Sequence, residues 1–299
     1  MAFRRRTVRR RRRYATKKRF RRRNAARKRV QRIRRRQIVD ISARKCRDNM
    51  AGISIGSDGT AGPVSTPAVV TGNVLGAFLF CASARGSVWG EAEAEYSRKM
   101  TEVYYKGYLD KATVETLSGG NWRWRRVMFQ CHSDDIIDTV LPNRMARTDS
   151  IMGHQRTMFN MNTPGNLDGY NALVRQLFQG TSGKDWGDVF LAVPDRKRNR
   201  VLMDKYRRID SGNGFGVVRT TRDYVAVNKK IRYNEKEEGD EKEPESGVVA
   251  AQQNYSWFAT PTRYSGGDVY CLDLFGCANG STEHSLNFLA HGTSYWHER

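Results

Sequence analysis

The sequence predicts an all-β body, a sandwich or roll of antiparallel strands, joined to a disordered arginine-rich N-terminal arm. Three observations support this prediction. Nearly all of the excess positive charge lies in the first 36 residues. The rest of the chain forms short runs of aromatic and β-branched residues, separated by Gly, Asn, Asp or Pro. No succession of βαβ units is present. We therefore expect an arm over 1–42 and one β-domain over 43–299.

The arm is a polycation. Residues 1–36 hold 18 Arg and 3 Lys and no acidic residue, a charge of +21, whereas residues 37–299 sum to +1. Such a segment cannot bury a core, so we expect it to stay disordered until a polyanion neutralises it. Apolar residues at near-helical spacing between 25 and 41 leave open a helix there after neutralisation, beside the alternative of disorder throughout.

Ten segments of the body are candidate strands, because each combines β-branched, aromatic or alternating apolar residues with turn residues nearby. In chain order they are Val74–Cys81, Thr101–Leu109, Ala112–Leu117, Trp122–Cys131, Val189–Val193, Arg200–Ile209, Tyr224–Tyr233, Asn254–Thr260, Val269–Phe275 and His284–Ala290.

Two segments of the body do not fit the strand pattern. A helix is predicted over Asp168–Phe178, where Tyr170, Val174 and Leu177 share one face and Gly180 follows as a cap. Residues 234–247 hold seven acids and two lysines, so they predict an exposed acidic loop between strands.

Composition and motifs argue against several classes of protein. No apolar stretch follows the basic start, as a secretory signal would need, and the uncharged run 59–84 is too rich in Pro, Gly and Ser for a membrane span. Five scattered cysteines without a CxxC pair indicate reduced, buried side chains rather than disulfides or zinc ligands. We expect no cofactor and no metal.

No catalytic constellation stands out. Asp134, Asp135 and Asp138 could hold a cation, but a turn after a strand is the favoured interpretation. The glycine-rich segments 183–184 and 212–216 lack the spacing of a phosphate-binding loop, and the five histidines lie outside any hydrolase or metalloprotease motif. The sequence therefore predicts that the protein is not an enzyme.

The arm carries the strongest functional signal. Arginine binds phosphate as a planar, permanently charged fork, and phosphate neutralisation releases counterions, so binding should be strong, salt-sensitive and indifferent to base sequence. The same blocks match a basic nuclear localisation signal. The expected DNA-binding residues are Arg4, Arg5, Arg6, Arg9, Arg10, Arg11, Arg12, Arg13, Lys17, Lys18, Arg19, Arg21, Arg22, Arg23, Arg27, Lys28, Arg29, Arg32, Arg34, Arg35 and Arg36.

A second candidate for DNA contact lies in the body, at Trp122, Arg123, Trp124, Arg125 and Arg126. Tryptophan faces stack on bases and arginine binds phosphate, a combination typical of single-strand binding. Alternation along a strand would mix charged and apolar side chains on both faces. The alternative is therefore that the tryptophans pack in the core or in a subunit contact.

Several segments match one protein family in order. TEVYYKGYLDKATVETLSGGNWRWRRVMFQC, Thr101–Cys131, resembles the central segment of genomovirus capsid proteins, in which a tyrosine-and-glycine strand leads to a Trp/Arg-Arg strand. Four later segments are similar to further motifs of that family: Leu177–Phe190 with its glycines and DW pair, Arg200–Gly214 with its DK strand and turn, Asn228–Gly239 with its acidic loop, and Thr293–Arg299 with its YWHE ending. Geminivirus and circovirus capsid proteins share the arm-plus-β plan more distantly.

The resemblance implies a single eight-stranded antiparallel jelly roll made of two sheets. It implies a homo-oligomer of about 60 copies, a T=1 icosahedral virion around a circular single-stranded DNA genome. It also implies entry to the host nucleus through the host nuclear import machinery, with no membrane involved. Tyr295 and Trp296 are expected to be exposed, so Thr293–Arg299 is a candidate subunit contact.

Two other functions stay open at this stage. A cellular nucleic-acid-binding protein with a histone-like tail would stay small in solution, whereas a capsid protein would sediment as a shell. An enzyme with a basic targeting arm would gather acids or histidines in a pocket.

Overall fold

The body of the protein is mostly β-structure in antiparallel sheets. The computed structural model describes residues 41–86, 96–132, 136, 139–140, 142–149, 152–210, 214–234 and 257–298. The chain divides into two compact units, Met1–Arg44 with Arg299, and Lys45–Glu298, and the described residues belong almost entirely to the second. The predicted helix over 25–41 lies outside the described residues except for Ile41, and so does the acidic loop except for Asn234.

The first large sheet holds five strands, in the order β1-β13-β6-β11, with β4 paired to the first residues of β13. Strand β6 is continuous and joins two segments that were predicted separately. The strands are β1 (Arg44–Met50), β4 (Ala68–Thr71), β6 (Glu102–Thr116), β11 (Val218–Arg232) and β13 (Ser285–Glu298).

The second large sheet has the order β10-β7-β12-β5 and consists of β5 (Gly76–Cys81), β7 (Trp122–Cys131), β10 (Arg200–Ile209) and β12 (Asp268–Cys277). A smaller sheet has the order β3-β2-β9-β8, and its β2–β9 pair is parallel. It consists of β2 (Gly52–Ile55), β3 (Ala61–Val64), β8 (Arg147–Asp149) and β9 (Gly153–Phe159). Two helices are described, α3 (Pro142–Met145) and α4 (Leu167–Leu177).

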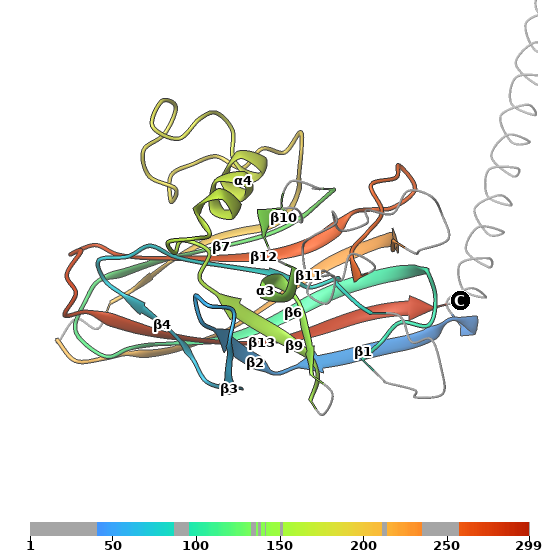
Figure 1. Cartoon of the computed structure of the whole chain (residues 1–299), viewed down its shortest axis with the longest axis horizontal. Coiled ribbons are helices and arrows are strands. Elements are labelled where there is room, and N and C mark those ends of the chain that lie inside the picture. The colour runs from blue at the N-terminus through green and yellow to red at the C-terminus, as the bar shows by residue number, and fades with distance from the viewer. Residues whose placement is uncertain are drawn as a thin grey trace, which may run out of the picture. The chain divides into compact units, whose positions relative to one another are not determined.

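The two large sheets stack as layers of a sandwich (Figure 1). Their facing side chains form two apolar clusters, one around Phe80 and Tyr105 and the other around Trp124 and Phe288. All four side chains are buried. Burial of each such side chain contributes about 1.5–3 kcal/mol, so the space between the sheets is the main core.

Helix α4 covers the outer face of the second sheet, as Figure 1 shows. Leu173 and Leu177 recur at helical spacing and pack in one cluster with Val127 and Leu272 of that sheet. Whereas the edge strand β10 is largely exposed, strands β5, β7 and β12 of the second sheet are therefore buried on both faces. This is why β5 has the uninterrupted apolar sequence GAFLFC rather than an alternating one.

Most of the predicted elements are confirmed. Strands β7 and β10 have the predicted bounds, and β5, β6, β11, β12 and β13 overlap the other predicted runs. The predicted helix coincides with α4 to within one residue at each end. Strands β1 to β4, β8 and β9 were not predicted, because four of them have only three or four residues.

Two predicted strands are wrong. Residues 189–193 lie in the loop between α4 and β10, where Leu191 is 77% exposed and its backbone N–H donates to the carbonyl of Asp188. The described part of Asn254–Thr260 forms only an isolated bridge between Ala259 and Tyr233. Both segments are apolar because parts of them pack on the core, as Phe190 and Phe258 do.

The C-terminal segment also differs from expectation. Strand β13 lies between β1 and β6, and Trp296 is buried in the inter-sheet core with the Arg85 guanidinium 5.5 Å from its ring centre. Trp296 therefore offers no surface to a neighbouring subunit, whereas Tyr295 and His297 keep partly exposed side chains. Cys81, Cys131 and Cys271 are buried in the core clusters and behave as small hydrophobic residues.

A buried carboxylate joins β5 to β12 at the edge of the core. The Ser83 hydroxyl donates to Asp268 Oδ1 at 2.7 Å, and the Ala259 N–H donates to Oδ2 at 3.0 Å. Burial outweighs these hydrogen bonds and raises the pKa of Asp268 to about 6. The folded protein therefore binds this proton more tightly than the unfolded chain does.

We predict that Asp268 makes the fold less stable as the pH rises through about 4 to 6. The full shift corresponds to up to about 3 kcal/mol of unfolding free energy. Urea unfolding of wild type and Asp268→Asn across this range should show wild type losing stability relative to the variant. Parallel pH profiles in the two proteins would contradict the assignment.

Candidate functional site

The five residues expected to contact DNA lie on strand β7, and their side chains point to opposite faces of the second sheet. Trp122, Trp124 and Arg126 point between the sheets, whereas Arg123 and Arg125 point toward the side covered by the loop after α4. The alternation follows from the two-residue period of a strand. Each face meets a different environment, so the five residues do not form one surface.

Arg126 lies at the centre of a buried ionic cluster. Its guanidinium contacts Asp273 at 2.7 Å, Asp110 at 2.8 Å and Asp223 at 3.2 Å. Arg156, from β9, enters the same space and contacts Asp110 at 3.2 Å and Asp273 at 3.0 Å. None of these five side chains is more than 2% exposed.

Two further cations bind the carboxylate at the edge of the cluster. Lys205 and Arg207 of β10 contact Asp223 at 2.7 and 2.6 Å. Burial alone would raise the pKa values of Asp110 and Asp223, but the neighbouring cations outweigh burial and hold both below the ordinary value. Asp110 and Asp223 are therefore charged, and four cations contact the three carboxylates of the cluster.

The register of the strands assembles this cluster. Asp110 and Asp223 are cross-strand partners in the first sheet, and Arg126 is the cross-strand partner of Asp273 in the second. Two like charges directly opposite each other repel, so the Asp110–Asp223 pair needs a cation from the facing sheet. Because Arg126 contacts carboxylates from both sheets, the cluster holds the sheets in alignment. Its buried groups are closed to solvent, so a substrate cannot reach them.

The tryptophans pack in the core. The Trp124 indole N–H donates to Asp273 at 2.9 Å, and its ring stacks on Phe275 with centres 5.5 Å apart. Trp122 and Trp124 have no exposed surface. The expected DNA contacts at Trp122, Trp124 and Arg126 are therefore corrected, because these side chains are buried within one chain.

Arg125 anchors the loop that follows α4. It makes a two-pronged ion pair with Asp204, at 3.0 and 2.8 Å, and donates to the carbonyls of Val189 and Phe190. It is 5% exposed. Four of its five N–H donors are thus used within the protein, and the expected DNA contact is corrected here too.

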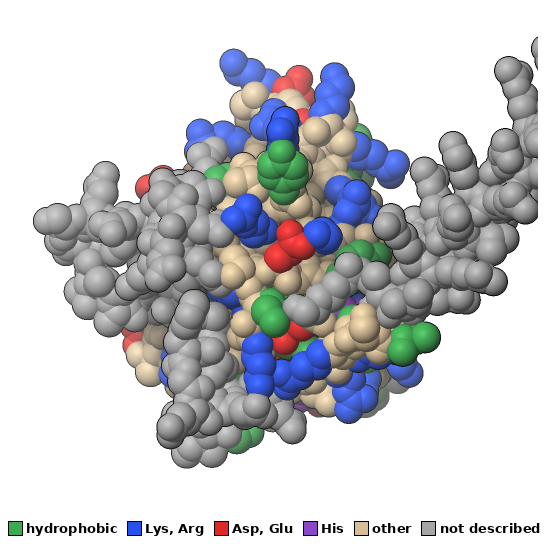
Figure 2. Space-filling model, turned by 90° about the vertical axis from the view of Figure 1, so that its right-hand side faces the viewer, with side chains coloured by type: hydrophobic (Ala, Val, Ile, Leu, Met, Phe, Trp, Pro, Cys, Tyr) green, Lys and Arg blue, Asp and Glu red, His purple; other side chains and the backbone are tan. Residues whose placement is uncertain are grey.

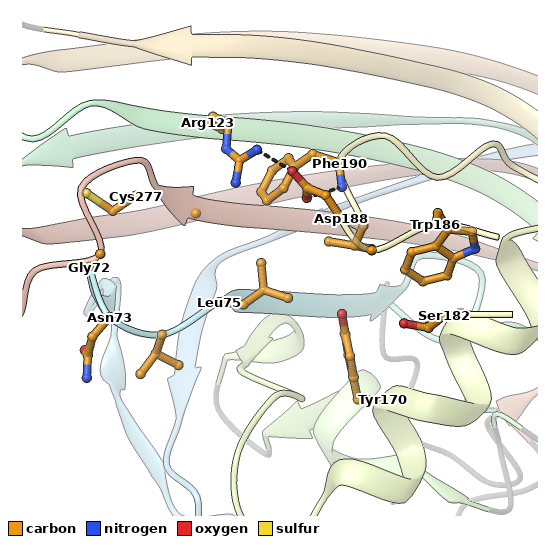
Figure 3. Close-up of a pocket in the computed structure, with 15 residues that line it drawn as sticks. Gly72, Asn73, Leu75, Arg123, Tyr170, Ser182, Trp186, Asp188, Phe190 and Cys277 are labelled. Atoms are coloured by element: carbon orange, nitrogen blue, oxygen red, sulfur yellow. Dashed lines mark hydrogen bonds and ion pairs between the residues drawn. The ribbon is translucent and has the colours of Figure 1, made fainter. Parts of the chain in front are cut away.

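Arg123 is the one partly exposed member of the five, and it lines a pocket of about 460 Å³ between β12, α4 and the loop after α4 (Figure 3). Tyr170, Trp186 and Phe190 form aromatic walls. Arg123 pairs with Asp188 at 2.5 Å and lies 4.4 Å from the Phe190 ring centre. The pocket's cation is neutralised by a carboxylate, so the pocket has no charge complementary to phosphate.

The remaining sequence candidates fall outside the described residues. They are the arm residues between Arg4 and Arg36 and the aspartates Asp134, Asp135 and Asp138. Within the part of the chain that the structure describes, no three His, Cys, Asp or Glu side chains gather as metal ligands do. None of the described helices is both long enough and apolar enough to cross a membrane.

The ionic cluster was not predicted from the sequence, although a signal for it exists. Asp273 is the single charge in the apolar run VYCLDLFGC, and Asp110 and Asp223 occupy inward positions of their strands. A lone acid at an inward position predicts a buried cationic partner. Identifying that partner as Arg126 or Arg156 requires the pairing of the sheets.

Neither a search against protein-family models nor a search of curated proteins found a match to this sequence. Function is therefore argued from charge, topology and site geometry.

We predict that Asp273→Asn lowers the free energy of unfolding by about 3–5 kcal/mol, because it leaves two buried guanidinium groups undercompensated. The matched control is Glu102→Gln, which breaks the exposed Glu102–Lys230 pair and should cost less than about 1 kcal/mol. Urea unfolding of both variants measures the difference. Equal losses in the two variants would contradict a structural role for the cluster.

Proposed function

We propose that this protein is the capsid protein of a small single-stranded DNA virus, a structural protein without enzymatic activity. About 60 copies would form a shell, and the arginine-rich arm would bind the packaged circular genome. The observation that carries the proposal is the charge partition. The arm has a charge of +21, whereas the β-body is nearly neutral at +1.

The order of the strands supports a jelly roll as the finer description of the fold. The first sheet contains the path β4-β13-β6-β11 and the second the path β5-β12-β7-β10. Along the chain, β4, β5, β6 and β7 alternate between sheets, β10 stays in the second sheet, and β11, β12 and β13 alternate again. Two interleaved Greek keys of eight strands have this connectivity.

The charge of the body further supports the proposal that the arm, and not the body, neutralises the genome. Arg126 and Arg156 are neutralised inside the sandwich, and Arg123 and Arg125 are paired with aspartates. Sixty arms would bring about 1,260 positive charges to a genome that has one phosphate per nucleotide. We therefore propose that the arms supply most of the neutralisation and that small cations supply the rest.

The arms would repel one another in an empty shell, because each carries a high like charge. Assembly should therefore be coupled to DNA, with the acidic loop at 234–247 facing away from the genome. We also propose that the arm is recognised by the host nuclear import machinery, since its basic blocks match such signals.

We predict that deletion of residues 1–36 removes most of the affinity for single-stranded DNA and flattens its dependence on salt. Fluorescence anisotropy with one oligonucleotide across a salt series measures both quantities. A thermal unfolding transition like that of the full chain serves as the control for folding. Unchanged affinity after the deletion would contradict the assignment of binding to the arm.

We further predict that the purified full-length protein forms icosahedral shells when single-stranded DNA is added, and few shells without a polyanion at low salt. Electron microscopy and sedimentation measure the outcome. Arms protected from protease in shells but cleaved in dissociated protein would support their internal position. A protein that binds DNA but stays small under all conditions would favour the alternative, a cellular nucleic-acid-binding protein with a histone-like tail.

A further inference from the structure

A groove of about 280 Å³ lies on the outer face of the first large sheet, the face turned away from the sandwich core. Met50, Val225 and Trp296 point into the core from β1, β11 and β13, so residues in alternate positions of these strands point outward. The groove is lined by Lys45, Cys46, Arg47, Lys106, Tyr224, Tyr295 and His297.

Two tyrosines form an aromatic platform in this groove. The rings of Tyr224 and Tyr295 meet edge to face with centres 6.3 Å apart, and Tyr224 is 53% exposed. Gly107 of β6 makes room for this arrangement. A Cβ atom added there would lie 2.6 Å from the Tyr224 hydroxyl oxygen and 2.5 Å from the Val225 carbonyl oxygen. Any larger residue at this position would displace the ring of Tyr224.

The groove is cationic and has no acidic lining residue. Lys45, Arg47 and Lys106 are exposed, and no carboxylate among the described residues pairs with them. Farther along the same face, Lys111 lies directly opposite Arg222 across the β6–β11 pair. Two like charges in this position repel each other, so an anionic ligand bound on this face would relieve the repulsion.

Figure 2 views the body from the end at which β1 begins and β13 finishes. Lysine and arginine side chains gather over the described surface at this end, and acidic side chains are few. In the sequence, Lys45 follows within a few residues of the basic arm. Strand β1, which contributes Lys45 and Arg47 to the groove, therefore follows closely after the arm in the sequence.

We propose that this groove binds single-stranded nucleic acid, with bases stacked on Tyr224 and Tyr295 and phosphates held by Lys45, Arg47 and Lys106. A cationic groove with aromatic faces is the combination that binds unpaired bases without sequence preference. Paired bases in a duplex do not expose their faces to such rings, so the site selects single strands. The inference rests on the proposed DNA-packaging function and adds to it a contact to bases, which an arginine arm does not provide.

The pocket beside Arg123 provides a useful contrast. It also has aromatic walls, but its cation is already paired with Asp188. The groove on the first sheet combines accessible rings with cations that no carboxylate among the described residues pairs with. This difference in charge is what assigns the nucleic acid to the groove.

The test uses the full-length protein and two oligonucleotides of equal length, one of thymidines and one of abasic sites. Both have the same phosphates, so the arm binds them alike, and only a stacking site distinguishes them. At about 0.5 M salt, where phosphate contacts weaken, wild type should bind the thymidine strand about tenfold more tightly. Tyr224→Ala should remove this preference, whereas Tyr224→Phe should retain it.

The matched control is Tyr206→Ala, which removes a tyrosine that is 54% exposed on β10 of the other sheet and should leave the preference unchanged. Photocrosslinking of wild type to an iododeoxyuridine strand should map to peptides containing Tyr224 or Tyr295. Equal affinity of wild type for the two strands would overturn the groove site while leaving arm binding intact. Loss of binding to both strands at low salt would instead overturn the proposed function. A Tyr224→Ala protein that changes its oligomeric state but keeps the base preference would identify a subunit contact and overturn the proposal.

Discussion

The sandwich depends on the pairing of Arg126 with three carboxylates at its centre. Asp110 and Asp223 face each other within one sheet, and Asp273 lies beside Arg126 in the other. No single sheet satisfies these charges, because the cation and two of its partners come from opposite layers. The strand register and the alignment of the two sheets are thus specified together. A shift by one residue would turn these buried charges toward the wrong face.

The ionic cluster also shapes the apolar core around it. The Arg156 guanidinium lies 4.7 Å from the Phe80 ring centre and 6.0 Å from that of Phe288, and these two rings belong to different apolar clusters. The cluster therefore lies where the two halves of the inter-sheet core meet. Burying charges is costly unless every partner is present. We interpret its role as selecting one arrangement of the sheets rather than adding net stability.

The body is nearly neutral because its acidic residues nearly equal its basic residues in number, and several of its arginines are paired internally. Guanidinium groups on β7 and β9 are used inside the protein, in ion pairs and in anchoring a loop to the second sheet. Helix α4 and its following loop cover the outer face of the second sheet, so the two faces of the sandwich are not equivalent.

The sequence by itself determined the features that depend on local pattern. These are the charge of the arm, the all-β class, the bounds of β7 and β10, and helix α4, since alternation, helical spacing and charge are read within a few residues. Only the tertiary structure decided where the side chains of β7 go, because alternation separates two faces but does not say what covers each one. Trp124 and Arg126 lie in the core, and Arg125 anchors a loop, because both faces of β7 are covered. Trp296 lies near the chain's end but inside a central strand, because burial is set by the strands on either side and not by position in the sequence. The groove around Tyr224 likewise joins residues from four strands, whose proximity arises only from pairing across the sheet.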